Sequence, residues 1–246
     1  MNVIGIIPVR FKSTRFPGKP MVDINGKSMV QRVYEQASKA SGLDKVLIAT
    51  DEDLIYRHIQ EFGGNVCMTR TDHPSGTDRC KEALEQEAQE YNFVVNIQGD
   101  EPFIDPRQID ELINGLDSDV QIATQAKVIE QSNQIFDPNC VKVIIDPSGN
   151  AIYFSRTAVP HLRNHPQHLW TRHFKYHQHI GIYAYRSDIL QQITHLPVSP
   201  LEQAEGLEQL RWIENSYNIR VMITTYQAHG IDTPEDLEKV LATNRF

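Results

Sequence analysis

Short apolar runs alternate with helix-patterned segments in the first part of the chain. Four runs have the length and β-branched content of buried strands, at residues 3–9, 45–49, 65–68 and 92–97. Amphipathic helices are predicted between them, over about residues 28–40, 54–62 and 77–88. Strands joined by single helices form right-handed crossovers, so we expect an α/β fold whose mainly parallel central sheet has helices on both faces. Ligands of such sheets bind beyond the carboxyl ends of the strands, which places function in the loops after Val9, Met68 and Ile97.

The pattern changes from about residue 120. Four strands with little helix between them are predicted at residues 121–128, 141–145, 151–155 and 179–185. We therefore expect residues 120–186 to form a strand-rich, antiparallel arm. Two later helices are indicated by capping residues, Ser199 followed by Pro200 and Thr233 followed by Pro234. No segment has the composition of a linker, so residues 1–246 are expected to form a single domain.

Charge and cysteine content limit the classes of partner. The chain has 24 basic and 32 acidic residues, a net charge of −8, which does not favour binding to nucleic acid or anionic membranes. The three cysteines are widely and irregularly spaced, which fits neither a disulfide framework nor a paired-cysteine metal site. The amino terminus lacks the positively charged region of a secretory signal, and no apolar run reaches the roughly 18 residues of a membrane span. We expect a cytoplasmic protein that binds neither nucleic acid nor membranes.

The loop after the first predicted strand is a basic island in an acidic chain. The first 22 residues hold four cations and no acid, whereas the remainder holds 20 cations and 32 acids. The polar groups of this loop are Arg10, Lys12, Ser13, Thr14, Arg15 and Lys19. Guanidinium forks, an ammonium point charge and hydroxyl donors suit a polyphosphate, and Gly18 permits close backbone approach. Neither the P-loop motif nor the dinucleotide fingerprint is present, and a loop whose cations are simply solvated is the alternative.

Two aspartates in other loops offer carboxylates for a divalent cation. Asp100 directly follows the fourth predicted strand, and Asp232 precedes a helix whose cap position Thr233 already fills. Alone, Asp100 could be a turn residue and Asp232 could serve the helix terminus. Magnesium, however, takes one or two carboxylates together with phosphate oxygens of a substrate. With the basic loop, the two acids compose a site for metal-assisted nucleotidyl transfer.

Several sequence blocks, in order along nearly the whole chain, resemble those of the 3-deoxy-manno-octulosonate cytidylyltransferase (CMP-KDO synthetase) family. The blocks are the basic loop and residues 69–79, 96–102, 153–156, 179–186, 201–211 and 230–237. The basic loop alone indicates only the wider sugar nucleotidyltransferase group, whereas the His-x-Gly-Ile-Tyr and Leu-Glu-Gln-Leu-Arg blocks specify the family. The resemblance implies a Rossmann-like nucleotidyltransferase fold. It also implies transfer of CMP from CTP to the anomeric 2-hydroxyl of 3-deoxy-D-manno-octulosonate (KDO) for lipopolysaccharide biosynthesis, with Mg²⁺ and as a homodimer.

The resemblance also assigns roles to residues. The residues expected to bind the nucleotide are Arg10, Ser13, Thr14, Arg15, Lys19, Arg70, Ser75, Gly76 and Thr77. Asp100 and Asp232 become the magnesium ligands, and together with Arg10 and Lys19 they are the expected catalytic residues. The residues expected to face the sugar acid are Gln98, Arg156, His179, Tyr183, Glu208 and Gln209. An arginine reads the sugar's carboxylate bidentately, and the other side chains suit its hydroxyls. The arm at 120–186 is expected to serve dimerisation and sugar binding.

Alternatives stay open for the substrate and for single residues. The sugar could be 8-amino-KDO or another acid such as a sialic acid, and a protein that binds a nucleotide sugar without catalysis is a further candidate. Arg156 could be a surface cation, His179 a core histidine, and Glu208 and Gln209 the solvated side of a helix. Residues 161–179 hold six of the ten histidines, at spacings that favour an exposed arm over a zinc site.

Overall fold

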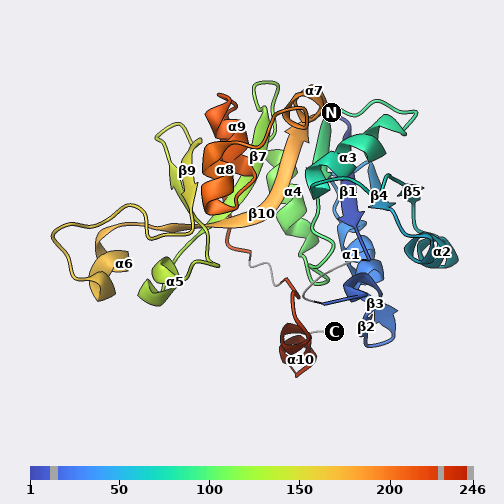
Figure 1. Cartoon of the computed structure of the whole chain (residues 1–246), viewed down its shortest axis with the longest axis horizontal. Helices are drawn as coiled ribbons and strands as arrows, with labels where there is room; N and C mark the ends of the chain where they lie inside the picture. The colour runs from blue at the N-terminus through green and yellow to red at the C-terminus, as the bar shows by residue number, and fades with distance from the viewer. Residues whose placement is uncertain (12–15, 227–229, 243–246) are drawn as a thin grey trace. The chain divides into compact units, whose positions relative to one another are not determined.

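The computed structural model describes residues 1–11, 16–226 and 230–242, and the chain divides into two compact units (Figure 1). The first unit comprises Met1–Asn114 and Ala228–Phe246, and the second comprises Gly115–Gln227. In Figure 1 the first unit runs from blue to green and includes the dark red helix α10, whereas the second runs from light green to orange. The strand-rich region predicted at residues 120–186 lies within the second unit.

A parallel sheet forms the centre of the first unit. Strand β1 (Val3–Val9) pairs with β4 (Lys45–Thr50) on one side and β6 (Phe93–Asn96) on the other, and β4 also pairs with β5 (Val66–Met68). Ile6 lies opposite Leu47 of β4 and Asn96 of β6, so three carboxyl ends are aligned. Six of the seven β1 residues are buried, as expected for a strand covered on both faces. The predicted mainly parallel sheet is confirmed.

The helices between these strands begin at capped positions. Helix α1 (Met29–Ala37) follows Ser28, whose hydroxyl accepts a hydrogen bond from the N–H of Gln31 at 3.2 Å. Helix α3 (Gly76–Glu85) follows Ser75, whose hydroxyl accepts from the N–H of Asp78 at 3.2 Å. Each cap stabilises its helix by about 1 kcal/mol. The unit also contains η1 (Lys19–Met21), β2 (Asp23–Ile24), β3 (Lys27–Ser28), α2 (Asp53–Glu61), α4 (Pro106–Asn114) and α10 (Pro234–Ala242).

Helix α4 is an element that the sequence analysis did not predict. Its signals are present in the sequence, because Pro106 stands at the first helical position and Ile109, Leu112 and Ile113 are all buried. The packing of α4 is tight, since a side chain at Gly42 would lie 2.9 Å from the Cδ1 atom of Ile113. The loop after β6 is therefore followed at once by a helix anchored in the core.

The second unit is mostly antiparallel. Strand β10 (His177–Arg186) pairs antiparallel with β7 (Ile122–Val128) and β8 (Lys142–Ile145), and β8 pairs antiparallel with β9 (Ala151–Ser155). The predicted antiparallel portion is thus confirmed. Strand β11 (Ile219–Ile223), which was not predicted, pairs parallel with β7. The helices of this unit are α5 (Ser132–Phe136), η2 (Gln167–Leu169), α6 (Trp170–His173), α7 (Ser187–Ile193), α8 (Pro200–Glu205) and α9 (Gln209–Glu214).

Aromatic side chains form much of the core of the second unit. Trp212 of α9 meets Tyr183 and Tyr185 of β10 edge-on, with ring centroids 5.3 and 5.5 Å apart. A separate cluster joins Trp170 and Tyr176 to Ile129, Ile135 and Cys140. Within the described ranges, none of the helices has both the length and the hydrophobicity that a membrane crossing requires.

Candidate functional site

Lys19 forms ion pairs with both of the predicted metal ligands. Its Nζ atom lies 2.7 Å from Oδ2 of Asp100 and 3.0 Å from Oδ1 of Asp232. The lysine side chain is 14% exposed, so its ammonium is largely withdrawn from water. Lys19 begins η1, and the preceding Gly18 has a φ of 72°, a conformation that glycine adopts without strain. Three residues predicted from separate loops therefore meet within the first unit.

A backbone hydrogen bond brings the segment of Asp232 to the loop of Asp100. The N–H of Ile231 donates to the carbonyl oxygen of Asp100 at 2.9 Å. The side chain of Ile231 is fully buried in a cluster with Ile24 and Met29. The Thr233 hydroxyl accepts a hydrogen bond from the N–H of Asp236 at 3.2 Å and so caps α10, as predicted. The Asp232 carboxylate is consequently placed toward Lys19 rather than used as the helix cap.

The Asp100 loop lies against the carboxyl end of β1. A side chain at Gly99 would approach the carbonyl oxygen of Pro8 and the side chain of Val9, both at 3.2 Å. The N–H of Ile97 donates to the carbonyl of Ile6 at 2.9 Å, which extends the β1–β6 pairing to the start of this loop. Glycine at position 99 thus permits the close approach that puts Asp100 beside the basic loop.

Opposing effects act on the charges of this site. Burial lowers the pKa of Lys19, but the adjacent carboxylates of Asp100 and Asp232 outweigh burial and raise that pKa above its ordinary value of 10.5. Burial raises the pKa of Glu101 to about 8, and the charge of Asp100 adds to the effect. The Glu101 carboxyl is therefore mostly protonated at neutral pH, a feature that the sequence analysis missed because the residue type alone suggests a surface acid.

The donor set fits magnesium held jointly by protein and substrate. In the described part of the chain, no group of three or more His, Cys, Asp or Glu side chains is arranged as a complete metal cage. Magnesium commonly uses only one or two carboxylates and completes its shell with phosphate oxygens and water. Asp100 and Asp232 supply two carboxylates, and the Lys19 ammonium between them acts as a stand-in cation.

The rest of the basic loop is only partly described. Arg10 is exposed, and the N–H of Gly18 donates to the carbonyl of Phe11 at 3.3 Å, which brings the two ends of the loop together. The predicted nucleotide ligands Ser13, Thr14 and Arg15 lie outside the described residues.

The predicted nucleotide turn lies at the amino terminus of α3. A side chain at Gly76 would lie 3.2 Å from the ring of Pro8, so this helix start packs closely against β1. Thr77 is buried, and Ser75 caps the helix. Exposed backbone N–H groups and the helix dipole make such a terminus attractive to anions. Ser75, Gly76 and Thr77 therefore lie beside the carboxyl end of the strand that leads into the basic loop, and their binding of the nucleotide stays a prediction.

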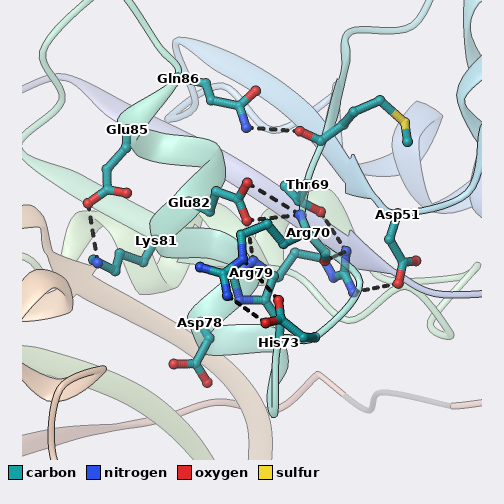
Figure 2. A network of polar contacts seen from close by, with 12 residues as sticks. Asp51, Thr69, Arg70, His73, Asp78, Arg79, Lys81, Glu82, Glu85 and Gln86 are labelled. Atoms are coloured by element: carbon teal, nitrogen blue, oxygen red, sulfur yellow. Dashed lines mark hydrogen bonds and ion pairs between the residues drawn. The ribbon is translucent and has the colours of Figure 1, made fainter.

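A buried arginine supports the neighbouring segment, and the sequence analysis did not identify it. Figure 2 shows Arg79 reaching from α3 to Thr69 and Asp51. Its Nη1 atom donates to the Thr69 hydroxyl and to the Arg70 carbonyl at 3.3 Å, and its Nη2 atom donates to Oδ2 of Asp51 at 3.2 Å. The residue is 2% exposed. Arg79 thus ties α3 to the segments that follow β4 and β5.

Arg70 takes part in this network through its backbone. Its N–H donates to the Glu82 carboxylate at 3.0 Å, and Glu82 also makes a short hydrogen bond with His73 (Figure 2). The Arg70 guanidinium instead pairs with Asp72, with Nε and Oδ1 2.9 Å apart, and the side chain is 70% exposed. The Arg70 guanidinium thus binds a carboxylate of its own loop, and a role in the nucleotide pocket stays a prediction.

Two predicted sugar ligands lie together on β10. The rings of His179 and Tyr183 have centroids 5.4 Å apart, and Nε2 of His179 lies 3.1 Å from the Thr124 hydroxyl. Burial lowers the pKa of His179 to about 3, so the imidazole is neutral. Burial, with a contribution from the charge of Glu208, raises the pKa of Tyr183 well above 10. Among the described residues the buried Tyr183 hydroxyl has no hydrogen-bond partner, an unusual state for such a group.

Glu208 and Gln209 lie at the start of α9. Gln209 is only 5% exposed, so it is not part of a solvated helix face, and that alternative is wrong for Gln209. Helices α8 and α9 are joined at Gly206 and held by an ion pair in which Nε of Arg211 lies 2.7 Å from Oε2 of Glu202. Arg211 is 8% exposed, so the pair that orients α9 is largely buried.

Arg156 is engaged with backbone carbonyls. Its Nε atom donates to the carbonyl of Glu205 at 2.7 Å. Its Nη1 atom donates to the carbonyl of Pro138 at 3.1 Å, and its Nη2 atom to the carbonyl of Gly206 at 3.3 Å. The side chain therefore has a structural role within the second unit, whatever it contributes to a ligand. Gln98, the remaining predicted sugar ligand, lies in the first unit, and its carbonyl accepts the N–H of Glu101 at 3.3 Å.

Comparisons with known proteins agree with these features. A sequence model described as Cytidylyltransferase matches residues 4–220. The 3-deoxy-manno-octulosonate cytidylyltransferase of Cytophaga hutchinsonii is 49% identical over 99% of this chain and 98% of its own length. The protein of the same name from Parabacteroides distasonis is 49% identical over 98% of both chains. A solved structure of CMP:2-keto-3-deoxy-manno-octonic acid synthetase complexed with CTP has a TM-score of 0.92 and 42% identity, covering 99% of this chain and 98% of that one.

Proposed function

The chain belongs to the 3-deoxy-manno-octulosonate cytidylyltransferase family, and from this premise we propose that it transfers CMP from CTP to the anomeric 2-hydroxyl of KDO. The family predicted from the sequence blocks is confirmed, as is the α/β nucleotidyltransferase fold. The reaction releases pyrophosphate and supplies CMP-KDO for lipopolysaccharide biosynthesis. The observation that best supports the proposal is the meeting of Lys19, Asp100 and Asp232 at one point.

The proposed reaction forms one bond and breaks another at the α-phosphorus. The 2-hydroxyl oxygen of KDO bonds to this phosphorus, its proton passes to solvent water, and the bond to the bridging oxygen of pyrophosphate breaks. Negative charge grows on the departing pyrophosphate, so fixed cations nearby lower the barrier. Lys19 keeps its positive charge because its pKa is raised, and in the sequence Arg10 and Arg15 belong to the same basic loop.

We propose that Asp100 and Asp232 hold Mg²⁺. Their oxygen donors and their joint approach to one cationic group support this assignment. When bound, the ion would offset negative charge on the phosphates. A homodimer is a further proposal, which rests on the family likeness. A cytoplasmic location is another, which rests on the composition of the chain.

The second unit offers neutral polar groups for the sugar acid. His179 is neutral, Gln209 is buried, and the Tyr183 hydroxyl is buried without a partner among the described residues. Such groups suit sugar hydroxyls, because a polar ligand would satisfy donors and acceptors that are already withdrawn from water. We propose that they contact KDO together with Gln98, Arg156 and Glu208.

The test is to supply sugar acids one at a time to the purified protein with CTP and Mg²⁺. Pyrophosphate release should occur with KDO and be much slower with 8-amino-KDO or a sialic acid. Release with one of the other acids and not with KDO would contradict the proposed substrate. Tight binding of CTP without release on any acid would instead indicate a protein that binds nucleotides without catalysis.

A further inference from the structure

The carboxylates of the proposed metal site are already occupied by a cation of the chain itself. We propose that Lys19 competes with divalent metal for Asp100 and Asp232, so that the metal binds tightly only when a nucleotide triphosphate draws the lysine away. The inference rests on the proposed function and adds to it a linkage between metal and nucleotide binding. Its basis is that one ammonium contacts one oxygen of each carboxylate, at 2.7 and 3.0 Å.

Competition follows from the charges at the site. Two aspartates and one lysine have a net charge of −1, whereas the same aspartates without the lysine would present −2 to a metal ion. An ammonium donates hydrogen bonds to the same carboxylate oxygens that a metal would coordinate. Lys19 is only 14% exposed, so water screens its repulsion of a nearby dication weakly. Metal and lysine therefore exclude each other from the carboxylates.

The lysine is the part of the site best able to move. The main chain beside Asp232 is tied to Asp100 by the 2.9 Å bond from Ile231, whose side chain is fully buried. The Lys19 ammonium, in contrast, is carried on a flexible stem of four methylenes. Phosphate oxygens are natural partners for such a point charge. A bound triphosphate therefore offers Lys19 a new partner while the two carboxylates remain in place for the metal.

The experiment measures binding of Mn²⁺, a paramagnetic substitute for Mg²⁺, by loss of the electron paramagnetic resonance signal of the unbound ion. Wild type, Lys19→Met and Lys27→Met are titrated without nucleotide. Lys27 is the matched control, since its ion pair with Glu35 at 2.6 Å lies elsewhere in the first unit. We expect Lys19→Met to bind Mn²⁺ about tenfold more tightly than wild type, because one repelling charge is removed, and Lys27→Met to bind as wild type does.

Two further variants separate charge from folding. Lys19→Arg keeps a positive charge, so it should bind Mn²⁺ as weakly as wild type. In the Lys19→Met background, Asp100→Asn should abolish the tight site. Adding the analogue of CTP with a methylene between the α- and β-phosphorus should raise Mn²⁺ affinity by a larger factor in wild type than in Lys19→Met. Thermal unfolding followed by circular dichroism establishes that each variant is folded.

The outcomes distinguish this inference from the proposed function. If Lys19→Met is folded but binds Mn²⁺ no more tightly than wild type, the competition between lysine and metal is overturned. If the Mn²⁺ site is nevertheless lost in Asp100→Asn, the proposed function still stands. Absence of Mn²⁺ binding in every variant, even with the nucleotide analogue, overturns both the metal assignment and this inference. Pyrophosphate release on KDO is measured separately, and its absence counts against the proposed function alone.

Discussion

The N–H of Ile231 donates a hydrogen bond to the carbonyl oxygen of Asp100 at 2.9 Å. Ile231 precedes Asp232, so this bond ties the segment of one proposed magnesium ligand to Asp100, the other proposed ligand. Because Ile231 is fully buried with Ile24 and Met29, the contact is backed by the core rather than by surface polar groups alone. The two carboxylates are therefore held together by main chain and packing, and their joint contact with Lys19 follows from the fold.

Replacement of Arg79 by Met should destabilise the protein. The change leaves Asp51, 16% exposed, without its guanidinium partner, and removes a donor from the buried Thr69 hydroxyl. We expect the free energy of unfolding to fall by about 2–4 kcal/mol, as when one member of a buried pair is removed. Arg107→Met is the control, because its pair with Asp105 involves a 73% exposed side chain and should contribute less than about 1 kcal/mol. Urea unfolding measures the free energy of unfolding of both variants. Equal decreases in the two would contradict the claim that the buried Arg79 stabilises the protein more than an exposed ion pair does.

Replacement of Tyr183 by Phe should separate stability from sugar binding. The hydroxyl is buried without a partner among the described residues, so its removal should leave the free energy of unfolding within about 1 kcal/mol of wild type. The KM for KDO should rise several-fold, because an oxygen that we propose contacts the sugar is lost, while the KM for CTP should stay unchanged. A large loss of stability, or equal effects on the two substrates, would contradict this assignment.

His179 should make the protein sensitive to acid. Burial lowers its pKa to about 3 from an ordinary value of 6.5, so between these values the unfolded chain takes up a proton that the native protein does not. The free energy of unfolding should therefore fall as the pH drops below 6.5, by up to about 1.4 kcal/mol per pH unit from this residue, and it should be independent of His179 above that pH.

The comparison with His179→Gln tests this dependence. Glutamine does not titrate, and its amide can still meet the Thr124 hydroxyl, which lies 3.1 Å from Nε2 of the histidine. Urea unfolding at several pH values between 7 and 4.5 should show a shallower slope for the variant. Parallel slopes for the two proteins would mean that other groups cause the acid sensitivity.

Much of the first unit could be predicted from the sequence because its signals are local. The apolar runs gave strands β1, β4, β5 and β6 within a few residues, and Ser28 and Ser75 cap helices as their positions indicate. The rule that ligands bind at carboxyl ends of parallel strands then placed Asp100 near the basic loop. Asp232 was proposed as its partner because Thr233 already fills the cap position, but no local pattern reports the contact between Ile231 and Asp100 that brings the two segments together.

What the sequence could not show are partners distant along the chain. Arg79 has the type of a surface helix cation, yet it is buried against Asp51 and Thr69. Arg156 likewise gives no sequence signal of the three carbonyl groups that it contacts. Strand β11 has a short apolar run, but its parallel pairing with β7 depends on the tertiary packing of the second unit. These features arise from tertiary packing, which residue types and spacing do not determine.

The most direct test of the account is a double-mutant cycle at Asp100 and Asp232, measured as the affinity for Mn²⁺ in the presence of the methylene analogue of CTP. If both aspartates hold one ion, Asp100→Asn and Asp232→Asn should each remove the tight site. The double variant should then bind scarcely more weakly than either single variant, because the shared interaction is already lost. Losses that simply add, or a tight site that survives both substitutions, would contradict the claim that the two carboxylates serve one metal ion.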